Sequence, residues 1–125
     1  MIVEDEPIFR MDLSMRLKGF GFQQIDETAY AEDAIATIEP CAYDLVLMDV
    51  RLKGKLSGLD AAQQIASSCT TTPIMIMSAY QLNVPNIRTK VPTLVGFAPK
   101  PISDRVLREC VDEAVRSARE RDAAH

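Results

Sequence analysis

Short apolar runs alternate with longer amphipathic stretches along this chain, and that alternation limits the possible folds more than any other feature. The runs are Met1–Val3, Phe22–Ile25, Leu45–Met48, Ile74–Met77 and Thr93–Ala98. Such a series of βα units builds a parallel sheet that is covered by helices on both faces. At 125 residues the chain has the length of one domain. We therefore predict a doubly wound α/β domain with five parallel strands.

Helical spacing is clear in four of the intervening stretches. A first helix of about three turns has Phe9, Leu13, Leu17 and Phe20 on one side and stops at Gly19 and Gly21. A second is predicted from about Glu32 to Glu39, where Pro40 ends it, and a third follows Gly58. The last begins after Ser103 as N-cap and is expected to fray after Ala118. This predicts a domain over residues 1–118, followed at 119–125 by a tail or the start of a linker.

The stretch from Gln81 to Pro92 is different, because it contains Pro85 and Pro92 and few good helix formers. A fourth helix belongs here in a five-unit βα series. We predict that it is irregular, a loop with at most one helical turn, with Asn86 as its possible cap.

Charge and cysteine content exclude several classes of protein. Acidic residues outnumber basic ones by 18 to 14, which argues against direct binding to nucleic acid, and no apolar run is long enough to span a membrane. Cys41, Cys69 and Cys110 lack CxxC spacing and are expected to be reduced thiols. The single histidine, His125, is a tail residue, so catalysis that depends on histidine is excluded. These features favour a cytoplasmic protein.

Polar residues with a shared chemistry follow four of the predicted strands. Ligands of an open parallel sheet bind beyond the carboxyl ends of its strands, so these residues should line one crevice. Three carboxylates meeting there, Glu4, Asp5 and Asp49, repel one another unless a cation lies among them, and oxygen ligands favour Mg²⁺. A carboxylate can then act as nucleophile toward phosphorus, while Ser78 and Lys100 stabilise charge on the phosphoryl oxygens.

This constellation resembles the receiver domain of response regulators in two-component signalling, over nearly the whole chain. The matching segments are Ile2–Glu6, Leu45–Asp49 with Gly58 beyond it, Met77–Ala79, and Phe97 three residues before Lys100-Pro101. The resemblance implies a flavodoxin-like receiver fold with strand order 2-1-3-4-5.

The resemblance also implies a role for each matching residue. Asp49 would be the phosphoacceptor, and Mg²⁺ would be bound by Asp5, Asp49 and the main-chain carbonyl of Arg51, with Glu4 assisting through a water. Ser78 would move toward the phosphoryl group and Phe97 would follow it as the aromatic switch. Lys100 would pair with Asp49 or its phosphate.

Some positions depart from the family pattern. The family usually has proline four residues after the acceptor and glycine eight after it, whereas here Lys53 holds the first position and Gly58 lies nine residues on. The loop is therefore one residue longer. Together with Ser78-Ala79-Tyr80, it resembles a branch whose members often work with non-standard histidine kinases. By family geometry Arg51 and Tyr80 flank the path of an attacking water, so we expect them to modulate the lifetime of the acyl phosphate.

The leading interpretation is a signalling switch and not an enzyme. It would be phosphorylated by a histidine kinase or phosphotransfer protein and read out by a partner or an output domain. Two alternatives stay open: a pseudo-receiver that binds partners without phosphorylation, and a Mg²⁺-dependent aspartyl phosphohydrolase. The latter generally needs a second carboxylate two residues after the nucleophile, where this chain has Arg51. The sequence does not determine the cognate kinase, the output or the oligomeric state.

Overall fold

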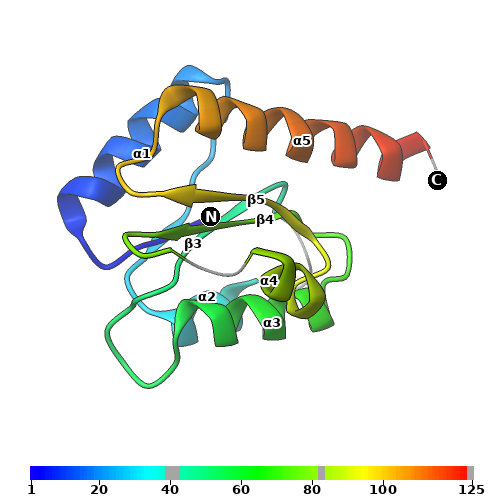
Figure 1. The fold of residues 1–125 in the computed structure, drawn as a ribbon. Coiled ribbons are helices and arrows are strands. Elements are labelled where there is room, and N and C mark those ends of the chain that lie inside the picture. Colours follow the sequence, from blue (N-terminus) through cyan, green and yellow to red (C-terminus); the bar gives the residue numbers. More distant parts are fainter. Residues whose placement is uncertain (39–42, 82–83, 124–125) are drawn as a thin grey trace.

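The computed structural model describes residues 1–38, 43–81 and 84–123. Within them, five parallel strands form one sheet in the order β2-β1-β3-β4-β5 (Figure 1). The strands are β1 (Ile2–Val3), β2 (Glu27–Thr28), β3 (Val46–Asp49), β4 (Ile74–Ser78) and β5 (Leu94–Pro99). The predicted sheet and its strand order are confirmed.

Helices cover both faces of the sheet, as predicted. They are α1 (Pro7–Gly19), α2 (Ala31–Thr37), α3 (Gly58–Ser68), α4 (Val84–Lys90) and α5 (Asp104–Ala123). In Figure 1, α1 and α5 lie above the sheet, and α2, α3 and α4 lie below it. The predicted end of α2 at Glu39 and Pro40 lies outside the described residues.

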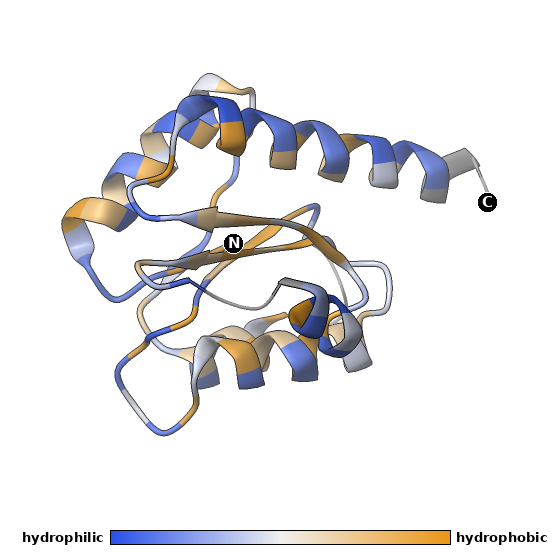
Figure 2. Ribbon diagram, in the orientation of Figure 1, coloured by the Kyte–Doolittle hydropathy of each residue, from blue (hydrophilic) through white to orange (hydrophobic). Residues whose placement is uncertain are grey.

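Alternate residues of the central strands enter two separate cores, because side chains of a strand point to opposite faces. Val46, Met48, Ile74 and Ile76 pack with α2, α3 and α4, whereas Leu47, Met75 and Met77 pack with α1 and α5. Both faces are therefore apolar, which explains why the strand sequences read as continuous hydrophobic runs. Figure 2 shows this as hydrophobic strands between helices whose apolar sides face the sheet.

The position of the second strand was predicted wrongly. The run Phe22–Ile25 precedes β2, which consists of Glu27 and Thr28. Those two residues pair with Ile2 and Val3, so the register of β1 determines which residues form β2. Phe22 and Ile25 are apolar because they pack against the core beneath α1 and α5.

The fourth helix is also more regular than predicted. The expectation of at most one helical turn is wrong, because α4 runs for seven residues from Val84. Pro85 is its second residue, where a missing backbone N–H removes no helical hydrogen bond. Asn86 is thus inside the helix and not its cap. Pro92 comes after the helix has ended at Lys90.

The last helix starts as predicted but is longer. Ser103 caps it, since its Oγ accepts a hydrogen bond from the N–H of Val106 at 3.2 Å. The helix continues to Ala123, so the expected fraying after Ala118 is wrong. Within this helix Glu113 and Arg116, three residues apart, form an ion pair, and neither side chain is buried. The proposed boundary between domain and tail stays a prediction.

The cysteines differ from one another. Cys110 is a free, buried thiol, as expected. Cys69 is disulfide-bonded, so the expectation of three reduced thiols is wrong at this position. Cys41 and His125 lie outside the described residues. Across the helices in the described ranges, none combines the length and apolar character needed to cross a membrane.

Candidate functional site

The register of the central strands brings the predicted site residues to one edge of the sheet. Asp49, the last residue of β3, pairs with Met77, and Ser78, the last of β4, pairs with Pro99. The backbone N–H of Lys100 then donates to the carbonyl of Ser78 at 2.8 Å. Glu4 directly follows β1, which pairs with β3. The carboxyl ends of four neighbouring elements therefore meet at the place that the sequence predicted.

Lys100 joins two of the three carboxylates. Its Nζ lies 3.0 Å from both carboxylate oxygens of Glu4 and 3.0 Å from Oδ2 of Asp49. Glu4 is fully buried and Asp49 is 4% exposed, so water scarcely screens these contacts. A buried charge needs such a partner, because an uncompensated charge is strongly destabilising. The lysine thus holds the two carboxylates side by side.

The pKa values of Glu4 and Lys100 are both raised, for different reasons. Burial and the adjacent Asp49 raise the pKa of Glu4 to about 8, although Lys100 opposes the shift. For Lys100, burial favours the neutral amine, but its contacts with Asp49 and Glu4 outweigh burial and raise its pKa. Burial and the neighbouring carboxylate thus make Glu4 harder to ionise than an exposed glutamate, whereas Lys100 favours its ionised form.

The three acidic residues fit a hard divalent cation. Glu4, Asp5 and Asp49 each offer a carboxylate oxygen, and these oxygens lie within 4.8 Å of one another. Asp5 is partly exposed, so a ligand can reach the cluster from solvent. The donors are all oxygens, which suits Mg²⁺ or Ca²⁺ and not zinc. The donor set thus agrees with the ion inferred from the sequence.

Two residues of α1 support this cluster and were not identified from the sequence. The Phe9 ring lies under Lys100, with 4.5 Å between its centroid and Nζ. The Arg10 guanidinium donates to the carbonyl of Glu4 at 2.6 Å and pairs with Glu27 at 3.5 Å. Phe9 had been noted only as an apolar position of the helix. The sequence feature that could have indicated Arg10 is its position about one helical turn after the acidic residues at the end of β1.

The residues that flank the cluster on its open side also lie together. Ser78 is buried, and its Oγ accepts a hydrogen bond from the backbone N–H of Tyr80 at 3.0 Å. The Arg51 backbone N–H points to Oδ1 of Asp49 at 3.4 Å. The Arg51 guanidinium stacks over the ring of Tyr80, 4.2 Å from its centroid. The loops after β3 and β4 are thereby linked next to Asp49.

Phe97 lies apart from the carboxylates. It is in β5, opposite Ile76 in the register, and is partly buried against the core beneath α4. Ile87 and Val91, from α4 and the residue that follows it, belong to the same core. Phe97 is therefore positioned between the edge that carries Ser78 and the fourth helix.

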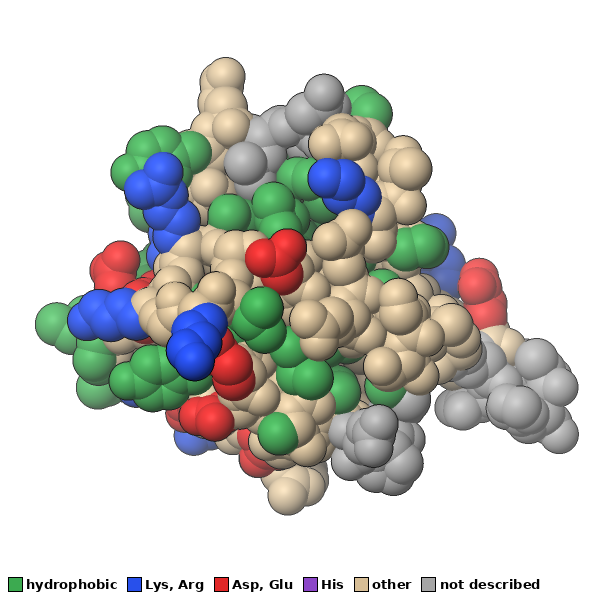
Figure 3. Space-filling view, turned by 90° about the horizontal axis from the view of Figure 1, so that it is seen from below, with side chains coloured by type: hydrophobic (Ala, Val, Ile, Leu, Met, Phe, Trp, Pro, Cys, Tyr) green, Lys and Arg blue, Asp and Glu red, His purple; other side chains and the backbone are tan. Residues whose placement is uncertain are grey.

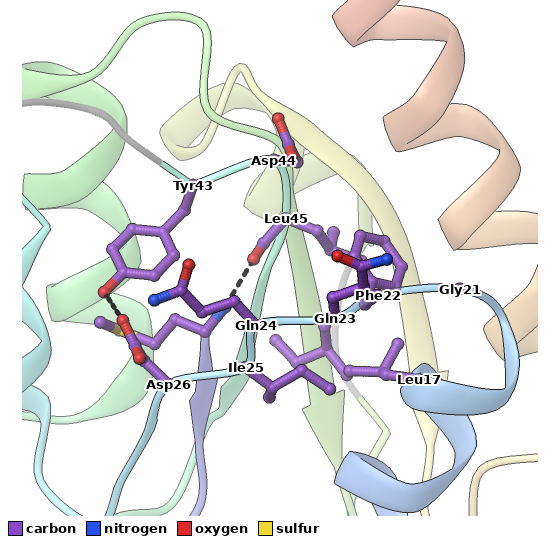
Figure 4. Close-up of a pocket in the computed structure, with 12 residues that line it drawn as sticks. Leu17, Gly21, Phe22, Gln23, Gln24, Ile25, Asp26, Tyr43, Asp44 and Leu45 are labelled. Carbon is purple, nitrogen blue, oxygen red and sulfur yellow. Dashed lines mark hydrogen bonds between the residues drawn. The ribbon is translucent and has the colours of Figure 1, made fainter.

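A cavity of about 470 Å³ opens elsewhere, on the amino-terminal side of the strands. Figure 4 shows it between the residues that precede β2 and those that precede β3, with the hydroxyl of Tyr43 hydrogen-bonded to Asp26. The hydrogen bond from the Met1 amino group to the carbonyl of Leu45, 2.9 Å long, lies at its wall. None of the predicted site residues lines this cavity. The carboxylate cluster at the other end of the strands is the stronger candidate.

Among the described residues, the face formed by α2, α3 and α4 shows no extended basic surface. Viewed from that side, Figure 3 shows acidic and basic side chains scattered among uncharged ones over the part of the chain that the structure describes. Proteins that bind nucleic-acid backbones usually concentrate Lys and Arg on one face. The distribution on this face agrees with the low basic content of the sequence.

The fold and the site define a class of protein: a doubly wound α/β domain with acidic residues and a lysine at the carboxyl edge of its sheet. The chain belongs to the response regulator receiver domain family, whose model matches residues 1–112. It is thus a receiver domain of two-component signalling, as the resemblance indicated.

Individual relatives agree with this assignment. The chain is similar to a transcriptional regulatory protein, PdtaR, of Mycobacterium tuberculosis, with 32% identity over 96% of this chain and 58% of the relative. It thus spans little more than half of that relative. Among solved structures, the signal receiver domain of a modulated diguanylate cyclase from Desulfovibrio desulfuricans is 25% identical, with a TM-score of 0.79 over 95% of this chain and 94% of that one. A CheY-like receiver domain protein from Methanospirillum hungatei, 19% identical, matches the fold with a TM-score of 0.82 over the same shares, 95% and 94%.

Proposed function

We propose that this domain is a phosphorylation-activated switch that accepts a phosphoryl group on Asp49. The observation that carries the proposal is the arrangement of Lys100, which contacts Asp49 and Glu4 at 3.0 Å beside the carboxylate of Asp5. In this arrangement Asp49 would be the nucleophile, Lys100 the cation and the three carboxylates the metal ligands of one largely buried cluster. Receiver domains act in signalling, and we propose no further enzymatic activity for this one.

The transfer step uses the side chain of Asp49 as nucleophile. One Oδ attacks phosphorus, a new O–P bond forms, and the bond from phosphorus to the donor breaks with its electron pair leaving on the donor group. Lys100 Nζ, which already contacts Asp49, balances the charge that the phosphoryl oxygens bring. Ser78, at the end of the next strand, would supply a hydroxyl to the same oxygens.

The acidic cluster would hold Mg²⁺ during this reaction. Asp5 and Asp49 would bind it directly with the main-chain carbonyl of Arg51, and Glu4 would act through a water. When bound, Mg²⁺ neutralises the phosphoryl oxygens and orients them toward the nucleophile. The charge of the ion would also favour the ionised form of Glu4 and so oppose the raised pKa of this residue.

The signal would pass from the acceptor toward α4. Ser78 and Phe97 are in neighbouring strands, and Phe97 packs in the same core as Ile87. Movement of Ser78 toward a phosphoryl group would open space that Phe97 can fill, and α4 would adjust to it. This supports the assignment of Ser78 and Phe97 as switch residues.

The donor would be a histidine kinase or a phosphotransfer protein in the cytoplasm. A partner protein or an output domain would respond to the phosphorylated domain. Relatives that extend beyond the matched region, such as the transcriptional regulatory protein named above, support an output domain. We propose no direct contact of this domain with nucleic acid or membrane.

Incubation with acetyl phosphate and Mg²⁺, followed by intact-mass measurement, tests the function. One stable added phosphate is expected on the wild type and none on Asp49→Asn, since an amide is a poor nucleophile. Asp60→Asn, which changes an exposed acid in the first turn of α3, is the matched control and should be modified normally. Rapid turnover without accumulation would favour a phosphohydrolase, and an unmodified wild type would favour a pseudo-receiver.

A further inference from the structure

The loop between β3 and α3, residues 50–57, is held at its tip by a side chain from another helix. Glu32, in the first turn of α2, accepts two backbone hydrogen bonds there. Its Oε1 lies 3.0 Å from the N–H of Lys55 and 3.0 Å from the N–H of Leu56. One carboxylate oxygen thus satisfies two consecutive backbone donors of a loop that has no regular structure.

Gly54 lets the loop close around that carboxylate. Its φ of 109° lies in the left-handed region, where residues with a side chain are strained. A β-carbon at this position would also lie only 3.3 Å from Oε2 of Glu32. Hydrogen bonds from its own backbone N–H and from that of Leu56 hold the pKa of Glu32 below its usual range. The carboxylate is therefore ionised at neutral pH and seated in a concave turn of the main chain.

The base of the same loop is fixed against the acceptor. The N–H of Gly58 donates to the carbonyl of Val50 at 2.8 Å, and a β-carbon on Gly58 would overlap the carbonyl of Asp49 at 1.7 Å. Arg51 lies between the two anchors, with its N–H directed at Asp49. At the other end, the side chains of Leu52 and Leu56 pack against the core, and Glu32 adds two hydrogen bonds to the main chain of the tip.

We propose that Glu32 is a positioning residue of the phosphoacceptor site, which holds the main chain of Arg51 in place by fixing the tip of the loop. The inference rests on the proposed function, because the carbonyl of Arg51 is assigned to Mg²⁺ only there. The added residue in this loop makes such an anchor useful, since a longer loop has more conformations to lose when it orders. Neither Glu32 nor Gly54 contacts the reacting atoms.

Three variants separate positioning from charge. Glu32→Ala removes both acceptor interactions, whereas Glu32→Gln keeps a single oxygen that can accept from both N–H groups. Asp33→Ala, the matched control, removes an exposed carboxylate one residue further along α2. Mg²⁺ affinity is measured by calorimetry, and amide exchange of residues 51–57 is followed in metal-free protein.

Glu32→Ala is expected to weaken Mg²⁺ binding by about tenfold, as loss of an outer support of a metal ligand does. Exchange of the Lys55 and Leu56 amides should be faster by about fivefold, the value of one ordinary hydrogen bond. Glu32→Gln should remain close to wild type in both measurements. Thermal unfolding of each variant checks that the fold is retained.

Unchanged exchange in Glu32→Ala would overturn the anchoring role. Faster exchange with unchanged Mg²⁺ affinity would overturn the link to the site. A loss of Mg²⁺ affinity that is equal in Glu32→Gln and Asp33→Ala would replace positioning by a general charge effect. Failure of the proposed function is distinguishable, since it appears as a wild type that acetyl phosphate does not modify while the metal-free exchange result still stands.

Discussion

The Arg51 guanidinium stacks on the ring of Tyr80, with 4.2 Å between its central carbon and the ring centroid. Each residue lies two positions after a site residue, Arg51 after Asp49 and Tyr80 after Ser78. The contact joins the loop after β3 to the loop after β4. If Asp49 is phosphorylated as proposed, we expect an attacking water to meet these side chains, as the sequence predicted for Arg51 and Tyr80.

Removal of the ring should shorten the lifetime of the acyl phosphate. An exposed cation–π contact is worth about 0.5–1 kcal/mol, so Tyr80→Ala should speed hydrolysis by about two- to fivefold. Arg51→Ala should act in the same direction, and Tyr80→Phe, which keeps the ring, should resemble wild type. Loss of the phosphate is followed by intact mass after removal of the donor. Equal rates in all four proteins would exclude shielding.

Asp5→Asn should weaken Mg²⁺ binding by more than about tenfold, because a charged oxygen ligand is lost from a solvent-accessible site. Asp5 is partly exposed beside two buried carboxylates, so its substitution should change the stability of the fold only slightly. Glu6→Gln changes an exposed neighbour and serves as the control. Calorimetric titration with Mg²⁺ measures both, and equal affinities would remove Asp5 from the ligand set.

Metal-free protein should lose stability as the pH rises because of Glu4. Its pKa is about 8 in the folded state and 4.5 ordinarily, so the folded state binds more protons between these values and the free energy of unfolding falls through this window. The slope is at most about 1.4 kcal/mol per pH unit. The Met1 amino group, with its pKa lowered to about 6 by burial, acts in the opposite sense above pH 6.

The difference between wild type and Glu4→Gln isolates this effect. The amide cannot ionise, so the stability of the variant should be independent of this proton, while Met1 contributes equally to both proteins. Urea unfolding in EDTA from pH 5 to pH 8 provides the measurement. A difference that does not change over this range would show that Glu4 is not protonated in the folded state.

The sequence predicted the acidic cluster because the end of an apolar run marks the end of a buried strand. Asp49 ends β3 and Lys100 follows β5, and parallel pairing brings these strand ends to one edge. The contacts of Arg10 and Glu32 could not be predicted in this way, because they depend on the rotation of α1 and α2 and on the path of a loop.

The errors in the fold have local causes. The second strand was placed at an apolar run that serves the core, while the pairing partners of β1 are the polar and exposed Glu27 and the adjacent Thr28. In the fourth helix, Pro85 was treated as an interior residue and not as one of the first turn. Both errors concern the residue at which an element starts. Residue propensity predicts the type of an element better than it predicts this boundary.

The last prediction concerns α4, which should be the least protected helix next to the site and should respond to phosphorylation. It has seven residues, too few for a stable isolated helix, so it depends on the packing of Ile87 and Val91 in the core that Phe97 shares. A shift of Phe97 would weaken or rearrange that packing. We expect amides in residues 86–91 to exchange faster than those of β4, and to change protection when beryllofluoride and Mg²⁺ are added as a phosphoryl mimic. Asp49→Asn should show the same basal exchange without the response. Slow exchange equal to that of α5 in both states of the wild type would contradict a role for α4 in transmitting the signal.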